Sequence, residues 1–275
     1  MGKSRLTNEI ISFLEKNASN LTAKECSEYL HCSESNIRNY CKKLNLQLKN
    51  GIRKSHLNLD QFLNFTSESA YILGWIWSDG YVYKNTITIE IIDKDAKELI
   101  PIMQTIGIWN VRTRYRKNRQ PQTIITCSSK EVAEYLRSLG KYPKSVESHT
   151  NVLATIPLHL RKYFILGLID GDGCFYLNKS QNIIQISISG SENQDWTGIF
   201  NYFTSLGISS NIHVQKTPIC CSAIRITNRK GILKLITELY IDTQLGLSRK
   251  REKAGEIKNY IMYENKSIKG SRKND

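Results

Sequence analysis

A nine-residue pattern that occurs twice constrains this sequence more than any other feature. Residues 72–80 and 165–173 both read Ile-Leu-Gly-x-Ile-x-x-Asp-Gly, and their acidic residues, Asp79 and Asp172, lie 93 positions apart. Because similar sequence follows each copy, this long spacing indicates a duplicated structural unit. Each copy is apolar over two helical turns, which predicts two similar helices that both end at a carboxylate.

The sequence after each copy predicts the same order of elements. Apolar and polar residues alternate at 87–91 and at 184–188, which is typical of half-buried strands. Each strand is followed by a helix that ends at a glycine of C-cap type, Gly107 or Gly207. The later predicted elements are strands at 110–115, 123–127, 211–216 and 222–227 and closing helices at 130–139 and 229–239. We therefore expect an α+β fold with two pseudo-symmetric halves, each with a four-stranded antiparallel sheet.

Residues 1–50 predict a small all-α module. Three short amphipathic helices begin at the capping residues Thr7, Thr22 and either Ser33 or Ser35. The third helix is basic on its outer side, where Arg38 and Lys42 lie, and the pair formed with the second helix resembles a helix-turn-helix unit that binds DNA. An ordinary three-helix cap with a solvated basic face is the alternative.

These patterns define the expected domains. They are the helix-turn-helix-like module at 1–50, a linker at 51–65, the first half at 66–150, the second half at 151–262, and a basic disordered tail at 263–275.

The composition restricts the class of function. The net charge of +14 indicates a polyanionic partner, and nucleic acid is favoured over a membrane because the chain shows neither a basic amphipathic helix nor a lipid anchor. The start of the chain lacks an apolar signal segment, so we expect an intracellular protein of the cytoplasm, the nucleoid or an organelle. Seven cysteines without a Cys-x-x-Cys pair favour reduced thiols over a disulfide framework or a zinc site.

Residues 66–262 resemble the single-chain LAGLIDADG homing endonucleases. The resemblance rests on both motifs, on the repeated order of elements, and on Ile156-Pro157 shortly before the second motif. It implies two motif helices packed side by side through their small residues, and two saddle-shaped sheets that lie in the DNA major groove. Gly74 and Gly167 suit this helix interface, since a residue without a Cβ lets two backbones approach closely.

The resemblance also implies a catalytic centre. Asp79 and Asp172 match the family's catalytic acids, which bind a divalent cation; Mg²⁺ is expected, since it prefers oxygen ligands. Asp170 has Trp77 at its place in the first copy, and residues two apart on a helix point about 200° apart. We therefore interpret Asp170 as a helix-end or packing residue.

One basic residue is expected beside each acid. By the same resemblance, the stretches 141–145 and 248–251 supply Lys144 and Lys250, with Arg249 or Arg251 as alternatives to Lys250. Their role would be to stabilise charge in the transition state or to activate water. A solvated basic loop that binds phosphate remains the alternative for each.

The candidate DNA contacts lie on predicted strands and on the third helix. Arg112, Arg114 and Arg116 alternate, so on a strand they share one face, where guanidinium groups suit guanine edges or phosphates. The other candidates are Lys117, Arg119, Tyr81, Tyr83, Tyr176, Asn178, His213, Gln215 and Arg225, together with Arg38 and Lys42 of the N-terminal module.

We expect a monomeric, Mg²⁺-dependent endonuclease that cuts both strands of a long, partly asymmetric DNA site and promotes mobility of its intron or host element. The alternative is a non-cleaving nucleic-acid-binding protein of the same fold, either an RNA maturase that assists splicing or a transcription regulator. The presence of both acids favours cleavage.

Overall fold

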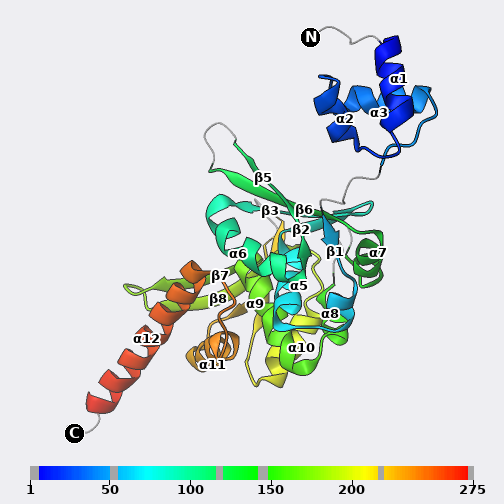
Figure 1. Cartoon of the computed structure of the whole chain (residues 1–275). Helices are drawn as coiled ribbons and strands as arrows, with labels where there is room; N and C mark the ends of the chain where they lie inside the picture. Colours follow the sequence, from blue (N-terminus) through cyan, green and yellow to red (C-terminus); the bar gives the residue numbers. More distant parts are fainter. Residues whose placement is uncertain (1–5, 50–54, 116–119, 142–147, 216–219, 272–275) are drawn as a thin grey trace. The chain divides into compact units, whose positions relative to one another are not determined.

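A computed structural model describes residues 6–49, 55–115, 120–141, 148–215 and 220–271 (Figure 1). The chain divides into two compact units, residues 1–54 and residues 55–275. Side chains are described as far as Tyr263.

The N-terminal unit is a three-helix module, as the sequence predicts. Its helices are α1 (Asn8–Asn17), α2 (Ala23–Tyr29) and α3 (Glu34–Lys43). Thr7, Thr22 and Ser33 cap them, so Ser33 rather than Ser35 begins α3. The module has its own core, which includes the fully buried Leu14 and Ile37.

The second unit is built from two halves with the same topology, which confirms the expected α+β fold. The first half contains α5 (Ser67–Ser78), β2 (Gly80–Tyr83), β3 (Thr86–Ile92), α6 (Asp93–Ile106), β5 (Asn110–Arg114), β6 (Gln122–Ser128) and α7 (Lys130–Ser138). The second contains α9 (Arg161–Asp172), β7 (Gly173–Asn178), β8 (Ile183–Ser191), α10 (Thr197–Ser205), β9 (Asn211–Gln215), β10 (Cys221–Ile226) and α11 (Arg229–Tyr240). The strand orders β2-β3-β6-β5 and β7-β8-β10-β9 are equivalent, and every pairing within them is antiparallel.

The structure adds elements that the sequence did not predict. They are β1 (His56–Leu57), α4 (Asp60–Leu63), β4 (Gly107–Ile108), α8 (His149–Thr155), a 3-10 helix η1 (Leu158–Leu160) and α12 (Ser248–Ser271). Within the described residues no single helix is long and apolar enough to span a membrane; α8 with Leu158–Asp172 passes such a test only as a pair bent by 120°.

Three boundaries differ from the sequence expectation. Residues 55–65, expected in a linker, belong to the second unit because Leu57 and Phe62 are buried in its core. Gly107 is not a left-handed helix cap, since its φ of 172° is extended and it begins β4, whereas Gly207 at φ 64° is left-handed. Residues 263–271, expected to be disordered, continue α12, because extending an existing helix costs little compared with starting one.

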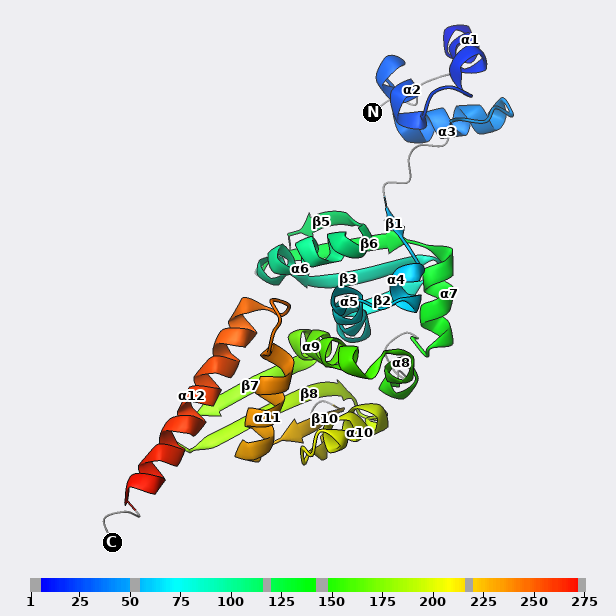
Figure 2. The ribbon, with the colours of Figure 1, turned by 60° about the horizontal axis from the view of Figure 1, so that its bottom comes forward.

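Helices α5 and α9 lie side by side at the centre of the second unit (Figure 2). Both are buried, and both approach through the third residue of the motif. A Cβ on Gly74 would lie 2.2 Å from the carbonyl oxygen of Phe164, and a Cβ on Gly167 would lie 2.2 Å from that of Tyr71. Only glycine fits at either position, so these two residues set the spacing of the halves.

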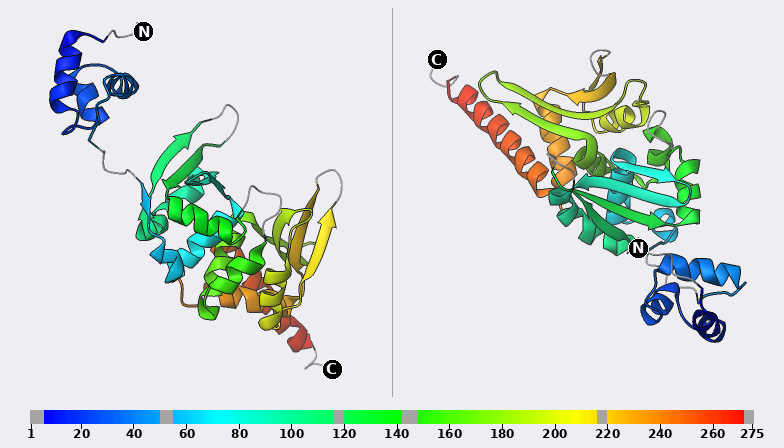
Figure 3. Two further views of the ribbon diagram at one scale, coloured as in Figure 1. Left: turned by 90° about the vertical axis from the view of Figure 1, so that its right-hand side faces the viewer. Right: turned by 90° about the horizontal axis from the view of Figure 1, so that it is seen from above.

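Each sheet presents one face to the helices and the other outward. The strand pairs β5–β6 and β9–β10 rise from the same side of the helix pair (Figure 3, left). Alternate residues such as Ile186 and Ile224 are buried against the core, while their neighbours point to the opposite face.

Candidate active site and nucleic-acid interface

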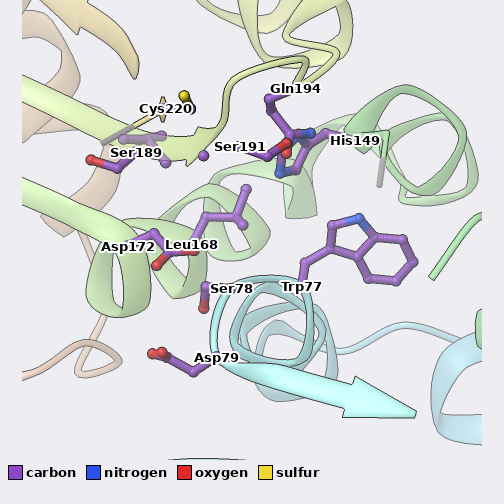
Figure 4. Close-up of a pocket in the computed structure, with 12 residues that line it drawn as sticks. Trp77, Ser78, Asp79, His149, Leu168, Asp172, Ser189, Ser191, Gln194 and Cys220 are labelled. Carbon is purple, nitrogen blue, oxygen red and sulfur yellow. The ribbon is translucent and has the colours of Figure 1, made fainter. Parts of the chain in front are cut away.

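The two motif acids lie at the ends of the paired helices. Asp79 caps the C-terminus of α5, and Asp172 is the last residue of α9. Both line one hollow of about 600 Å³, with His149 and Gln194 on its other side (Figure 4). The duplicated sequence therefore brings its two carboxylates to a single site.

Gly171 allows this close approach of the helix ends. A Cβ on Gly171 would lie 2.0 Å from Ser78 Oγ and 2.9 Å from Asp79 Oδ2. The seventh position of the second motif therefore packs directly against the end of the first motif, and a side chain there would displace the side chain of Ser78 or Asp79.

The carboxylates offer donors of the type that Mg²⁺ takes. Among the described residues no group of three or more His, Cys, Asp or Glu side chains is arranged to hold a metal ion. Mg²⁺ commonly uses one or two carboxylates and completes its shell with water and substrate phosphate. Asp79 and Asp172 fit such an ion as oxygen donors.

A buried lysine lies against the end of each motif helix. Lys250 is 6% exposed, and its Nζ donates to the carbonyl oxygens of Ile169 and, at 2.8 Å, Gly173. Lys141 is 1% exposed, and its Nζ donates to the carbonyl oxygen of Trp77 at 3.1 Å. The two halves thus share this feature as well as the acids.

The lysine expected from the sequence in the first half, Lys144, lies outside the described residues. Lys141, three residues earlier in the same stretch, bonds the carbonyl of the sixth position of the first motif, whereas Lys250 bonds the carbonyls of the fifth and ninth positions of the second motif. Lys141 directly follows the last turn of α7, where its amide donates to the Leu136 carbonyl at 3.0 Å. This position at a predicted helix end is the sequence feature that could have marked Lys141 as a candidate.

The charge of Lys250 responds to its surroundings. Burial lowers the pKa of Lys250 to about 8, opposed by the negative charges of Asp170, Asp95 and Asp79. Its ammonium group is therefore still the main form at neutral pH, but the free amine becomes accessible at mildly alkaline pH.

Asp170 is a packing residue of the helix pair, as the sequence suggested. It is 1% exposed, and its Oδ2 accepts from Tyr71 Oη at 2.7 Å and from the Leu247 amide at 2.9 Å. Burial raises the pKa of Asp170 to about 6. Trp77 at the same place in the first motif donates from Nε1 to the Ser148 carbonyl at 3.3 Å, so the surroundings of the two acids are not identical.

His149 forms part of the wall opposite the acids. Its ring stacks on Trp196 with centroids 5.6 Å apart, and its Nδ1 lies 3.3 Å from Gln194 Nε2. Burial lowers the pKa of His149 to about 4, so the ring is neutral at physiological pH. No motif marks this residue, which is why the sequence analysis missed it.

This buried imidazole predicts a loss of stability in mild acid. Between pH 6.5 and 4 the unfolded chain binds a proton at His149 that the folded chain does not, so this contribution to stability is complete above pH 6.5 and declines as the pH falls. Relative to a His149→Gln variant, we expect wild-type protein to lose about 2 kcal/mol of unfolding free energy between pH 7 and pH 4.5. Urea unfolding of both proteins at the two pH values measures it, and parallel pH dependences would contradict it.

The outward face of the second sheet gathers the candidate DNA contacts of that half. Residues opposite each other in register share a face. By the observed register, the outward face carries Tyr176, Asn178, Gln185, Ser187, Ser189, Asn211, His213, Gln215 and Arg225. All five residues proposed from the sequence in this half are among them, and Arg225 has a buried Nε that makes no hydrogen bond to the described part of the chain.

The outward face of the first sheet carries Tyr81, Tyr83, Arg112 and Arg114. Tyr83 and Arg112 are exposed, whereas Arg114 Nη1 pairs with Glu90 Oε1 at 2.9 Å on the same face. Arg114 therefore presents a charge that Glu90 partly neutralises. Arg116, Lys117 and Arg119 lie outside the described residues.

Helix α3 presents a polar outer face. Arg38 and Lys42 are exposed and, being four residues apart, lie on the same side, opposite the buried Ile37 and Cys41. Arg38 Nη2 pairs with Glu34 at 3.2 Å, an exposed pair that a phosphate can displace at small cost.

Comparisons with known proteins agree with this architecture. Residues 148–238 match the family model described as homing endonuclease, and residues 6–55 match that of the M protein trans-acting positive regulator (MGA) HTH domain. No curated protein matches the chain. The second half, which contains the second motif, thus matches the homing endonuclease family, and the N-terminal unit matches a helix-turn-helix domain.

Similar solved structures include the homing endonuclease I-WcaI bound to its DNA recognition sequence, with 12% identity, 71% of this chain and 91% of that chain covered, and a TM-score of 0.52. Mesophilic variants of the homing endonuclease I-DmoI show 18% identity over 63% of this chain and 95% of that chain, with a TM-score of 0.46. Full-length DUF199/WhiA from Thermatoga maritima shows 15% identity over 78% and 70%, with a TM-score of 0.47. At this identity the likeness to I-WcaI shows the shared fold.

Proposed function

We propose that the protein is a site-specific endonuclease that hydrolyses one phosphodiester in each strand of duplex DNA with the help of a divalent cation. The observation that carries the proposal is the convergence of Asp79 and Asp172 on one hollow at the ends of two packed helices. Two equivalent acids beside a pseudo-two-fold axis suit the cutting of two antiparallel strands.

Asp79 and Asp172 would hold the cation, which supplies charge neutralisation at the phosphate and a more acidic bound water. Lys141 and Lys250 keep a positive charge next to the end of each motif helix, where it stabilises negative charge developing on the phosphate. The outward faces of the two sheets would position the duplex through Arg112, His213 and Arg225, among the residues described above.

The test is cleavage of a library of long duplexes by the purified protein in Mg²⁺ or Mn²⁺, with EDTA as the control. We expect staggered cuts in both strands within one long sequence, and no cuts in EDTA. Tight binding at one sequence without cuts in any divalent ion would overturn the nuclease and favour a DNA-binding regulator. Binding to structured RNA in preference to DNA would favour a maturase. Promotion of the mobility of an intron or host element is the biological role that such cleavage would serve.

We also propose that α3 provides a second contact surface for the target DNA. Arg38→Ala/Lys42→Ala should weaken binding of the cognate duplex by about one to two decades at 0.15 M salt and lower the salt slope by about 2, since two phosphate contacts are lost. Glu28→Ala on α2, which pairs only with Lys24 at 3.5 Å among the described ion pairs, is the matched control. Equal affinities of the double variant and wild type would make the module a structural cap.

A further inference from the structure

The first turn of α12 is held by three carboxylates from other parts of the second unit. The Leu247 amide donates to Asp170 at 2.9 Å, and the Ser248 amide and hydroxyl donate to Glu98 Oε2 at 2.8 and 2.7 Å. Arg249 donates from Nε and Nη2 to the two oxygens of Asp95 at 2.9 and 2.7 Å. We call Asp95, Glu98 and Asp170 with residues 247–249 the carboxylate clamp.

The clamp joins the two halves. Asp95 and Glu98 lie in the first two turns of α6 in the first half, whereas α12 packs against α11 and β7 of the second half. Asp95 is 4% exposed, and its bidentate pairing with Arg249 fixes both the distance and the relative orientation of the two side chains. The amides of Leu247 and Ser248 belong to a helix start, where N–H groups have no partner within the helix and negative charge is favourable.

Lys250 comes directly after the clamp. Its side chain is buried while it carries a charge, a state that is costly unless the ammonium is hydrogen-bonded. A long lysine side chain that is free to move turns its ammonium toward water. The position of the first turn of α12 therefore decides whether the ammonium stays beside Gly173, the residue that follows Asp172.

Lys141 is positioned by a different structural feature. It follows α7 of its own half, and its amide closes the end of that helix on Leu136 at 3.0 Å. The lysine of the second half thus depends on a helix start tied to the other half, while the lysine of the first half follows a helix end within its own half.

We propose that Asp95 and Glu98 are positioning residues for Lys250, so that the first half of the protein controls the reactivity of the second-half active site. The proposal rests on the proposed nuclease function for its consequence, but the placement of Lys250 can be tested without DNA. The proposal predicts that a substitution in the clamp slows cleavage of one DNA strand more than cleavage of the other.

The first experiment measures how fast acetic anhydride modifies Lys250 in the intact protein, read by mass spectrometry. In Asp95→Asn we expect acetylation of Lys250 to be roughly tenfold faster, since a charge-assisted bond of the clamp is lost, while Lys141 reacts at the wild-type rate. Asp93→Asn is the matched control, because Asp93 lies on the same helix turn but bonds Thr123 at 2.9 Å and Lys97 at 3.1 Å, both in the first half. Unchanged protection of Lys250 in Asp95→Asn would overturn the proposal.

If Asp95→Asn does not fold, Glu98→Gln provides a second test of the clamp by the same acetylation measurement. Glu98 is half-buried and bonds only the start of α12 among the described hydrogen bonds, so its loss should accelerate acetylation of Lys250 by a smaller factor than the loss of the more deeply buried Asp95. Equal rates in Glu98→Gln and wild type would count against the clamp.

The second experiment measures cleavage of each strand of a target duplex that carries a different label on each strand. Asp95→Asn should slow one strand roughly tenfold more than the other, and Lys250→Met should slow that same strand. If Asp95→Asn slows cleavage of both strands equally, the proposal that the first half controls the second-half active site is overturned. If wild-type protein cuts no DNA, the nuclease function fails, and the acetylation rates still decide the clamp.

Discussion

Gly167→Ala is expected to destabilise the second unit by at least about 3 kcal/mol, at the upper end of the cost of overpacking a core. The added methyl group would lie 2.2 Å from the carbonyl oxygen of Tyr71, and the nearest other atoms are the Cα of Gly74 and the amide nitrogen of Trp75, both at 3.1 Å. All three are backbone atoms of α5, so no side chain can rotate away to make room. The helices must move apart instead.

The measurement is the melting temperature of the unit, which we expect to fall by roughly 6–12 °C for a protein of this size. Gly255→Ala on α12 is the control, since no atom lies within 4 Å of a Cβ at that position. Alanine there should stabilise the helix by about 0.5–1 kcal/mol. If both variants have the melting temperature of the wild type, the close approach of α5 and α9 is not the reason why the motif requires glycine.

Asp79→Asn and Asp172→Asn should each lower double-strand cleavage by at least about 10²-fold. Each substitution removes one of the two negative charges that face the hollow and weakens the hold on a divalent cation, while the neutral amide fills the same volume. Binding of the cognate duplex should be retained, because the arginine and histidine residues of the sheet faces are untouched. Cleavage and gel-shift assays on the same duplex separate the two effects.

The same substitutions should change the stability of the fold only slightly, because two effects oppose each other. Both acids lie at helix C-termini, where a negative charge interacts unfavourably with the helix dipole, whereas the negative charge of Asp79 favours the ammonium form of the buried Lys250. The melting temperature should therefore stay close to that of the wild type. Asp242→Asn, at an exposed position with φ 50° that asparagine tolerates, is the control for both assays. A variant of Asp79 or Asp172 that cuts at the wild-type rate would remove that acid from the proposed site.

The fold was largely predictable because duplication made each half a check on the other. The change from helical to alternating periodicity occurs after Gly80 and again after Gly173, and both strand pairs that follow have the expected order. Short elements such as β1 and α4 were missed, since Leu57 and Phe62 are apolar residues in a segment too short to show a period. Their burial depends on the core that the rest of the unit provides.

The lysines show what local sequence cannot decide. Both basic stretches were recognised, but Lys141 and Lys144 carry the same functional group in the same stretch, and only the packing after α7 shows that Lys141 is buried with its Nζ on the Trp77 carbonyl. His149 carries no motif, and its neutral state follows from burial beneath residues distant in sequence, such as Trp196.

The duplication, the two acids and the two glycines were predictable from the sequence, because the residues of a helix motif are recognised by their spacing along one segment. Only the folded structure shows that the halves are also joined through the clamp. The clamp pairs Asp95 with Arg249, which lie 154 positions apart, and Glu98 with Ser248, which lie 150 apart. Such pairs leave no periodic signal in the sequence, since each partner belongs to a different element and the two meet only in the folded unit.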